Sequence, residues 1–423
     1  MPPAESSAGQ GQADAEPLEE LLRRSAPAVL GTMIRRYGQF DACEDAVQEA
    51  LVAASVQWGN DGVPDHPLGW LITVASRRLA DAWRAETARH RREATAAGLA
   101  SPQELSTPAA DDYRDDRDDT LDLLFLCCTP ALTPESQVAL TLRAVGGLTT
   151  AQIAAAFLVP DATMTRRISR AKQRLAGTAF APLTATERGE RLGAVLHVLY
   201  LIFNEGYTAT TGPDLHRVEL SAEALRLTRT VHRILPDEGE VAGLLALMLL
   251  TDARRPARST GDGALVPLAA QDRTRWDAGQ ITEGIALLDD ALPRSLIGPY
   301  QVQAAIAAVH AEAAQAEDTD WQQIAALYEL LERLAPSPVV TVNRAVAVAL
   351  TDGPAAALRL VDTVEDPRYR ENHRLSATRA HLLEMSGDAV AARSWYETAA
   401  RQTTSLPEQR YLRAQAARLA GPR

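Results

Sequence analysis

The carboxy-terminal part of this chain, residues 181–423, spaces its apolar residues as helices do over nearly its whole length. It is rich in alanine and leucine, and it contains the runs RLGAVLHVLYLIF (191–203), EVAGLLALMLL (240–250) and QVQAAIAAVHAEAA (301–314). These runs predict antiparallel helical hairpins. Because the segments before residue 181 also show helical spacing, we expect an all-α fold: helical domains followed by an extension of helical hairpins.

Two glycines near the carboxy terminus suggest a repeat. TDGPAAALRLV and MSGDAVAARSW place Gly353 and Gly387 at the same point of a helical pair, 34 positions apart. This is the tetratricopeptide period, although the other consensus positions fit poorly. We therefore expect a helical extension over 181–295 and tetratricopeptide-like repeats over 296–423. Such arrays present concave surfaces to other proteins, which predicts a protein partner for the extension. Alternatively, these helices only pack on each other or on the first half.

Residues 148–175, LTTAQIAAAFLVPDATMTRRISRAKQRL, predict two short helices joined by a tight turn at Leu158-Val159-Pro160. A basic helix held against a scaffold helix is how many proteins enter the DNA major groove. Alternatively, this is an ordinary amphipathic helix with a solvated basic face. The second helix has a buried face of Met164, Ile168, Ala171 and Leu175, and a polar face of Thr165, Arg166, Arg167, Arg170, Lys172 and Arg174.

A second basic helix is predicted upstream, over residues 70–92. Arginines beside tryptophans can contact both the phosphate backbone and unpaired bases. The competing interpretation places Trp70, Trp83 or both in the core. The helix has an apolar stripe of Leu71, Val74, Ala75, Leu79 and Trp83, and it carries Arg77, Arg78, Arg84, Arg89, Arg91 and Arg92 against Asp81 and Glu86.

A third helix, over residues 41–58, is acidic. An acidic helix next to a basic one is not aimed at the same nucleic acid, so it indicates a protein-docking face; a solvated helix surface is the simple alternative. Its apolar side is Ala46, Val47, Ala50, Leu51 and Ala54, and the cluster on or beside the opposite side is Glu44, Asp45, Gln48 and Glu49.

The chain contains, in order, EDAVQEAL, HPLGWLITVASRRLADAWR, an acidic linker and the helix-turn-helix. This order resembles that of bacterial RNA polymerase sigma factors of the extracytoplasmic-function type, over roughly residues 17–177. The resemblance implies core RNA polymerase and promoter DNA as partners. The residues that it implies are Asp45, Gln48 and Glu49 for polymerase docking; Trp70, Arg77, Arg78, Asp81 and Arg84 for melting the minus-ten element; and Thr163, Thr165, Arg166, Arg167 and Arg170 for reading the minus-thirty-five element. The family often has glycine in the final turn, where this chain has Leu158.

The whole chain resembles the branch of that family with a long helical carboxy-terminal extension, which implies that the extension regulates the factor, or helps it act, in place of a membrane-bound anti-sigma protein. We expect a disordered amino terminus (1–16), a docking and melting domain (17–93), an acidic linker (94–122) and a helix-turn-helix domain (123–180). The net charge of −12 argues against a generally basic coat for nucleic acid. Basic residues concentrated in two helices suffice for such a protein.

Other chemistry has little support in the sequence. Cys43, Cys127 and Cys128 form no metal-ligand spacing, so we expect no metal, no cofactor and reduced thiols. The amino terminus has no signal pattern and no apolar run has transmembrane length, which predicts a cytoplasmic protein without a membrane partner. The polar clusters FNEGY (203–207) and QDRTRWD (271–277) could form an acid/base or anion-binding site. Without a nucleophile–base pair, helix caps and buried ion pairs are favoured, and we expect no enzyme.

Two functions remain. The first is an alternative sigma factor that works with core polymerase and is regulated by its own extension. The second is a helix-turn-helix transcriptional regulator with a helical-repeat sensor domain. Residues 41–92 favour the first, because a stand-alone regulator needs no docking helix followed by a melting helix.

Overall fold

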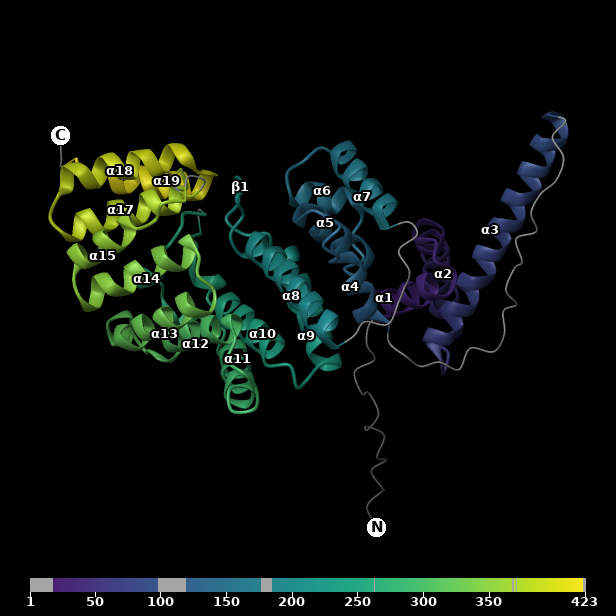
Figure 1. The fold of residues 1–423 in the computed structure, drawn as a ribbon, viewed down its shortest axis with the longest axis horizontal. Coiled ribbons are helices and arrows are strands. Elements are labelled where there is room, and N and C mark those ends of the chain that lie inside the picture. Colours follow the sequence, from purple (N-terminus) through teal and green to yellow (C-terminus); the bar gives the residue numbers. More distant parts are fainter. Residues whose placement is uncertain are drawn as a thin grey trace, which may run out of the picture. The chain divides into compact units, whose positions relative to one another are not determined.

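The computed structural model describes residues 18–97, 119–175, 185–261, 263–366, 369 and 371–420. The described residues are mainly α-helical, with one pair of two-residue strands and a longer connection with short 3-10 helices between residues 253 and 277, which confirms the all-α expectation (Figure 1). The helices before residue 180 are α1 (Leu18–Tyr37), α2 (Phe40–Asp61), α3 (Pro67–Ala97), α4 (Thr120–Cys127), α5 (Pro134–Ala144), α6 (Thr150–Ala156) and α7 (Asp161–Leu175).

The extension is helical, as its apolar spacing predicts. Its α-helices and strands are α8 (Ala185–Tyr207), β1 (Thr211–Gly212), α9 (Val218–Ile234), α10 (Gly239–Asp252), α11 (Ala278–Ala291), α12 (Pro299–Glu312), α13 (Trp321–Leu334), α14 (Pro338–Thr351), α15 (Pro354–Asp362), α17 (His373–Met385), α18 (Ala389–Gln402), β2 (Thr404–Ser405) and α19 (Leu406–Arg418).

The chain forms two compact units, and their boundary runs through the helix-turn-helix. The first unit is Met1–Thr150 with Met164–Arg191, and the second is Ala151–Thr163 with Leu192–Arg423. Nearly all of α6 and the turn after it therefore group with the extension, whereas most of α7 groups with the amino-terminal helices. The expected boundary near residue 180 does not separate the units by itself.

In the first unit, α1, α2 and α3 pack on one another around fully buried apolar side chains such as Met33 and Leu71. Helix α4 lies against α1 at a glycine: a Cβ on Gly31 would come within 2.7 Å of the Asp119 carbonyl oxygen. The Asp119 side chain is fully buried and accepts hydrogen bonds from Thr32 Oγ1 at 2.8 Å and Arg35 Nε at 3.0 Å. Only glycine permits this close approach, and two donors compensate the buried charge.

These contacts correct the expected linker over 94–122. Helix α3 continues to Ala97, and α4 begins at Thr120 directly after the buried Asp119. Residues 98–118 lie outside the described part of the chain, as does the amino terminus expected to be disordered. The acidic residues at the end of the linker therefore include one that anchors a helix.

In the second unit, α10 is apolar on every side, and α9, α11 and α12 pack around it. From α12 onward, each of α13, α14, α15, α17, α18 and α19 packs on the helix before it. Gly353 and Gly387 both have positive φ, +88° and +84°, at the turns before α15 and α18. A left-handed backbone is what glycine adopts readily, so the equivalent positions predicted from the spacing are confirmed. The tetratricopeptide character remains a prediction.

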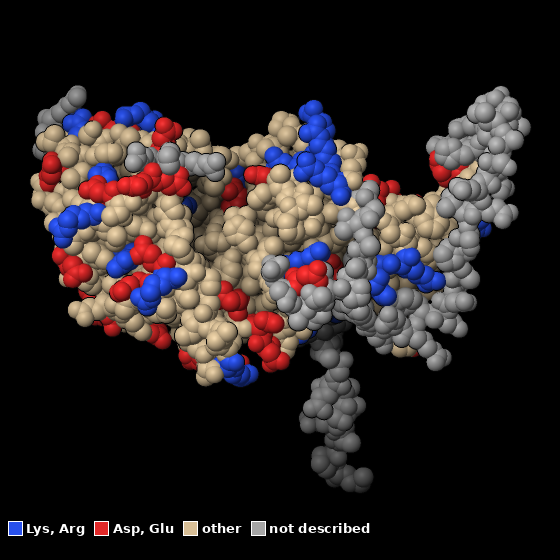
Figure 2. All heavy atoms as spheres, viewed as in Figure 1, with Lys and Arg blue, Asp and Glu red and all other residues tan. Residues whose placement is uncertain are grey.

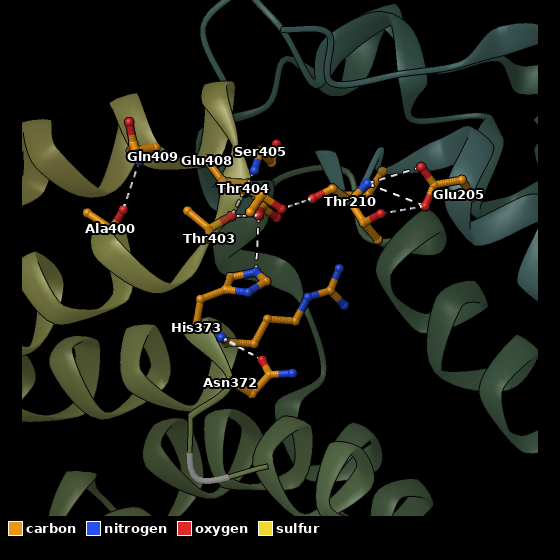
Figure 3. A network of polar contacts seen from close by, with 12 residues as sticks. Glu205, Thr210, Asn372, His373, Ala400, Thr403, Thr404, Ser405, Glu408 and Gln409 are labelled. Carbon is orange, nitrogen blue, oxygen red and sulfur yellow. Dashed lines mark hydrogen bonds and ion pairs between the residues drawn. The ribbon is translucent and has the colours of Figure 1, made fainter. Parts of the chain in front are cut away.

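A parallel strand pair joins the start of the extension to its end. β1 pairs with β2 in the register Thr211 with Thr404 and Gly212 with Ser405. Beside it, Thr404 Oγ1 donates to the Thr210 carbonyl at 2.8 Å (Figure 3). The carboxylate of Glu408 contacts His373 Nε2 at 3.0 Å and accepts from Thr403 Oγ1 at 2.9 Å. Both sides of the expected division at residues 295 and 296 lie in one compact unit, and the division itself stays a prediction.

Candidate functional site

Helix α2 presents an acidic face. Asp45, Gln48 and Glu49 are exposed, while Ala46, Val47 and Ala50 are buried, as the helical spacing predicts. Glu49 Oε2 lies 3.6 Å from Arg78 Nε, and more than half of each side chain is exposed. Burial, followed by the neighbouring carboxylate of Glu44, raises the pKa of Asp45. An exposed group held among like charges is available to a basic partner.

Glu44 lies in a different environment from Asp45, Gln48 and Glu49. It is buried, and its carboxylate lies 2.7 Å from Arg143 Nε of α5 and 2.5 Å from Lys172 Nζ of α7. Lys172 also lies 2.8 Å from Asp41, and its side chain is only 15 % exposed. Burial alone would lower the pKa of Lys172, but hydrogen bonds to Asp41 and Glu44 raise it. The expectations that Glu44 joins the docking face and that Lys172 joins the free basic face are wrong.

Replacing Glu44 with glutamine is expected to lower the free energy of unfolding of the first unit by about 2–3 kcal/mol. Breaking a buried ion pair leaves uncompensated charge, and Asp41 remains beside Lys172 to limit the loss. Hydrogen exchange of α2 amides at increasing urea concentrations measures this loss of unfolding free energy. Glu49→Gln is the matched control, because its exposed pair with Arg78 contributes less than about 1 kcal/mol. Equal losses in the two variants would contradict the assignment.

Helix α3 carries the five residues expected at the minus-ten element. Trp70 is half-buried and packs edge-on against Trp58, with ring centroids 5.2 Å apart. Arg77 and Arg78 are exposed, and the Arg77 side chain makes no hydrogen bond or ion pair within the described residues. Asp81 and Arg84 pair with each other at 2.8 Å.

The second tryptophan of α3, Trp83, is also half-buried and packs edge-on against Tyr37. Each tryptophan therefore has a core side and a solvent side. Side chains from residue 89 onward in α3, which include three of the expected arginines, lie outside the described part of the structure.

Helix α7 separates an apolar face from a basic one as expected. Met164, Ile168, Ala171 and Leu175 are buried. Thr165, Arg166 and Arg170 are exposed, whereas Thr163 and Arg167 are half-buried. Figure 2 shows Lys and Arg side chains gathered over this helix. Of the two adjacent arginines, Arg166 is the more exposed.

The turn before α7 has leucine at position 158, where the family often has glycine. Leu158 has φ +49°, the left-handed conformation that glycine adopts readily. The Val159 amide donates to the Ala154 carbonyl at 3.0 Å and the Leu158 amide to Ala155 at 3.2 Å. This is the Schellman pattern that ends helices. The chain therefore makes the ordinary turn with a branched residue, at a cost of about 1–2 kcal/mol.

The extension contacts this turn within the second unit. Arg217 donates from Nη1 to the Ala155 carbonyl at 3.2 Å and from Nη2 to the Thr211 carbonyl at 3.0 Å. Its Nε lies 3.4 Å from Glu205, and both side chains are more than four-fifths buried. A Cβ on Gly212 would meet Leu158 Cδ1 at 2.6 Å. No motif in the sequence points to Arg217; leucine at position 158, where the family often has glycine, is the signal that marks this turn as unusual.

The two polar motifs of the extension serve structural roles in large part. Glu205 of FNEGY holds Arg217 and accepts from Thr210 Oγ1 at 2.9 Å (Figure 3). In QDRTRWD, Asp272 caps the short helix Arg273–Arg275, and Asp277 caps α11 through the amides of Gly279 and Gln280. The expectation of caps and buried ion pairs is confirmed for these carboxylates.

The described residues contain no group of three or more His, Cys, Asp or Glu side chains placed to hold a metal ion. No described helix combines the length and the apolarity needed to cross a membrane. Cys43, Cys127 and Cys128 are buried free thiols, and burial raises the pKa of Cys43 and of Cys128 to about 12.

Comparison with known proteins matches three family models in order along the chain. They are Sigma-70 region 2 over residues 21–89, Sigma-70 region 4 over residues 122–175, and a Family of unknown function (DUF6596) over residues 191–292. A protein of Rhizobium meliloti (strain 1021), described as uncharacterized, is 42% identical over 410 residues, which cover 94% of this chain and 95% of that protein. No solved structure matches.

Proposed function

Because this chain is a sigma factor of the sigma-70 family with a long carboxy-terminal extension, we propose that it binds core RNA polymerase and directs it to promoters. We further propose that it is of the extracytoplasmic-function type and acts in the cytoplasm. The observation that carries the proposal is the exposed acidic face of α2 directly before the exposed arginines of α3, within the region 2 match.

We assign each surface a separate role. Asp45, Gln48 and Glu49 dock on the polymerase. Trp70, Arg77, Arg78, Asp81 and Arg84 hold the melted minus-ten element, for which α3 offers exposed guanidinium groups beside a fixed tryptophan. Thr163, Thr165, Arg166, Arg167 and Arg170 read the minus-thirty-five element, because they lie at the start of a basic helix.

In vitro transcription from a fragmented genomic library tests the proposal. Core polymerase with this protein is expected to start at a defined set of sites that share upstream elements, whereas core polymerase alone does not. The competing function is a stand-alone regulator with a sensor domain. That function would instead give specific DNA binding without core polymerase and no new start sites.

We propose in addition that the extension regulates promoter reading through the turn before α7. Arg217 binds the last carbonyls of α6, and Leu158 packs over Gly212. The same loop pairs with the end of the chain through β1 and β2. A conformational change near β1 or near β2 can therefore alter the conformation of the turn before α7 through these contacts.

Replacing Arg217 with alanine is expected to speed hydrogen exchange of amides 157–159 by about tenfold or more, because hydrogen bonds from a charged group contribute roughly 1.5–3 kcal/mol. Arg359→Ala, at an exposed position of α15, is the matched control. Initiation should change more at a promoter with a minus-thirty-five element than on a pre-melted template that lacks one. Unchanged exchange in the Arg217 variant would show that the extension does not hold the turn.

A further inference from the structure

Two arginines of the extension, Arg254 and Arg273, form no ion pair among the described residues. The chain after α10 reads Arg254-Arg255-Pro256-Ala257-Arg258. Arg255 pairs with Asp252 at 3.2 Å. Arg258 stacks on the Tyr207 ring, 3.7 Å from its centroid, and donates to the Tyr207 carbonyl and to Thr208 Oγ1. The Arg254 side chain makes no hydrogen bond or ion pair within the described residues, and its Nε is buried.

The second cationic segment lies beside Arg254. The Asp277 amide donates to the Ala253 carbonyl at 2.9 Å, which brings QDRTRWD next to the end of α10. Arg273 of that motif donates from Nη1 to the His310 and Ala313 carbonyls, at 2.6 and 2.5 Å, and from Nη2 to Thr319 Oγ1 at 3.1 Å, and it stacks on Trp276. Arg254, Arg273, Trp276 and His310 therefore form one group, which we term the basic cluster.

Four nitrogens of the basic cluster are buried without a hydrogen-bond partner among the described residues: Arg254 Nε, Arg273 Nε, Trp276 Nε1 and His310 Nδ1. The Trp276 and His310 side chains are 7% and 8% exposed. Buried polar atoms are nearly always hydrogen-bonded, so four unpaired nitrogens in one group indicate that a partner binds there.

The charges agree with this interpretation. Burial, followed by the charge of Arg254, lowers the pKa of both Arg258 and Arg273. Burial and then Arg254 and Arg273 lower the pKa of His310 to about 4, so its ring is neutral at pH 7. The carboxylates nearest Arg273, Glu317 and Asp318, are exposed.

We propose that the basic cluster binds a small anion whose charge is carried by carboxylate or phosphate groups. Arg254 provides a planar guanidinium group, the geometry suited to both kinds of anion, and Arg273, whose terminal nitrogens already donate to protein oxygens, adds its positive charge and its Nε–H donor. Trp276 and His310 supply ring N–H donors. Arg254 and Arg273 are half-buried, so part of each side chain reaches solvent.

Isothermal titration calorimetry of the full chain tests the site. Inorganic phosphate and succinate are titrated separately in a chloride buffer of fixed ionic strength, and the stronger binder identifies which anion is preferred. Arg254→Gln is expected to weaken that binding by at least about tenfold, because a charge-assisted hydrogen bond is worth more than a decade in affinity. The variant should still fold, since Arg254 has no partner to lose, and its Tm without anion should equal or exceed that of the unchanged chain.

Arg359→Gln removes an equal charge from an exposed position of α15 and should bind like the unchanged chain. The proposal is overturned if neither anion binds, if Arg254→Gln binds as tightly as the unchanged chain, or if Arg359→Gln weakens binding equally. The readout is binding and needs no polymerase. Its failure is therefore distinct from failure of the sigma-factor proposal.

Discussion

Replacing both Asp45 and Glu49 with lysine is expected to abolish co-purification with core RNA polymerase. Both side chains are exposed on α2, and reversing charges at an interface places like charges opposite each other, which costs several kcal/mol. An affinity loss of more than about a hundredfold follows, since each 1.4 kcal/mol is a factor of ten.

The fold should survive this change. Asp45 lies among other carboxylates that raise its pKa, so removing its negative charge relieves repulsion. Glu49 loses only an exposed pair with Arg78, worth less than about 1 kcal/mol. The matched control is the same double reversal at Glu19 and Glu20 of α1, which changes the net charge equally. Normal recovery of the Asp45/Glu49 variant with core polymerase would remove these residues from the docking surface.

Replacing Arg77 and Arg78 with alanine is expected to reduce initiation on duplex promoters by about tenfold or more while affecting pre-melted templates much less. Unstacking a base costs a few kcal/mol, which the protein recovers by holding the extruded base and its phosphates. Both guanidinium groups are exposed on α3. A pre-melted template removes the unstacking cost, so the defect should shrink there.

The single variants separate two effects. Arg77→Ala removes a side chain with no protein partner among the described residues, whereas Arg78→Ala also releases Glu49. A melting role therefore predicts that Arg77→Ala lowers duplex initiation without changing polymerase affinity. Run-off transcription on paired duplex and bubble templates measures this, and equal loss on both templates would assign the arginines to backbone binding or to the fold.

Local features of the molecule followed from the sequence because helical periodicity decides which side chains share a face. The buried stripe of α7, its exposed arginines and the exposed Asp45, Gln48 and Glu49 of α2 all depend on spacing within one helix. The turns at Gly353 and Gly387 are likewise local, since each depends on a left-handed residue between two helices.

The tertiary structure decided which element covers each face. Helical periodicity groups Glu44 with Asp45 on α2 and Lys172 with Arg170 on α7. The spacing within these helices does not predict that Glu44 pairs with Lys172 and Arg143. The burial of Asp119, the pairing of β1 with β2 and the contact of Arg217 with Ala155 join residues far apart in the chain. Long-range partners depend on how whole helices pack, so the sequence determined the helices and their faces, and packing alone determined which charges are buried and paired.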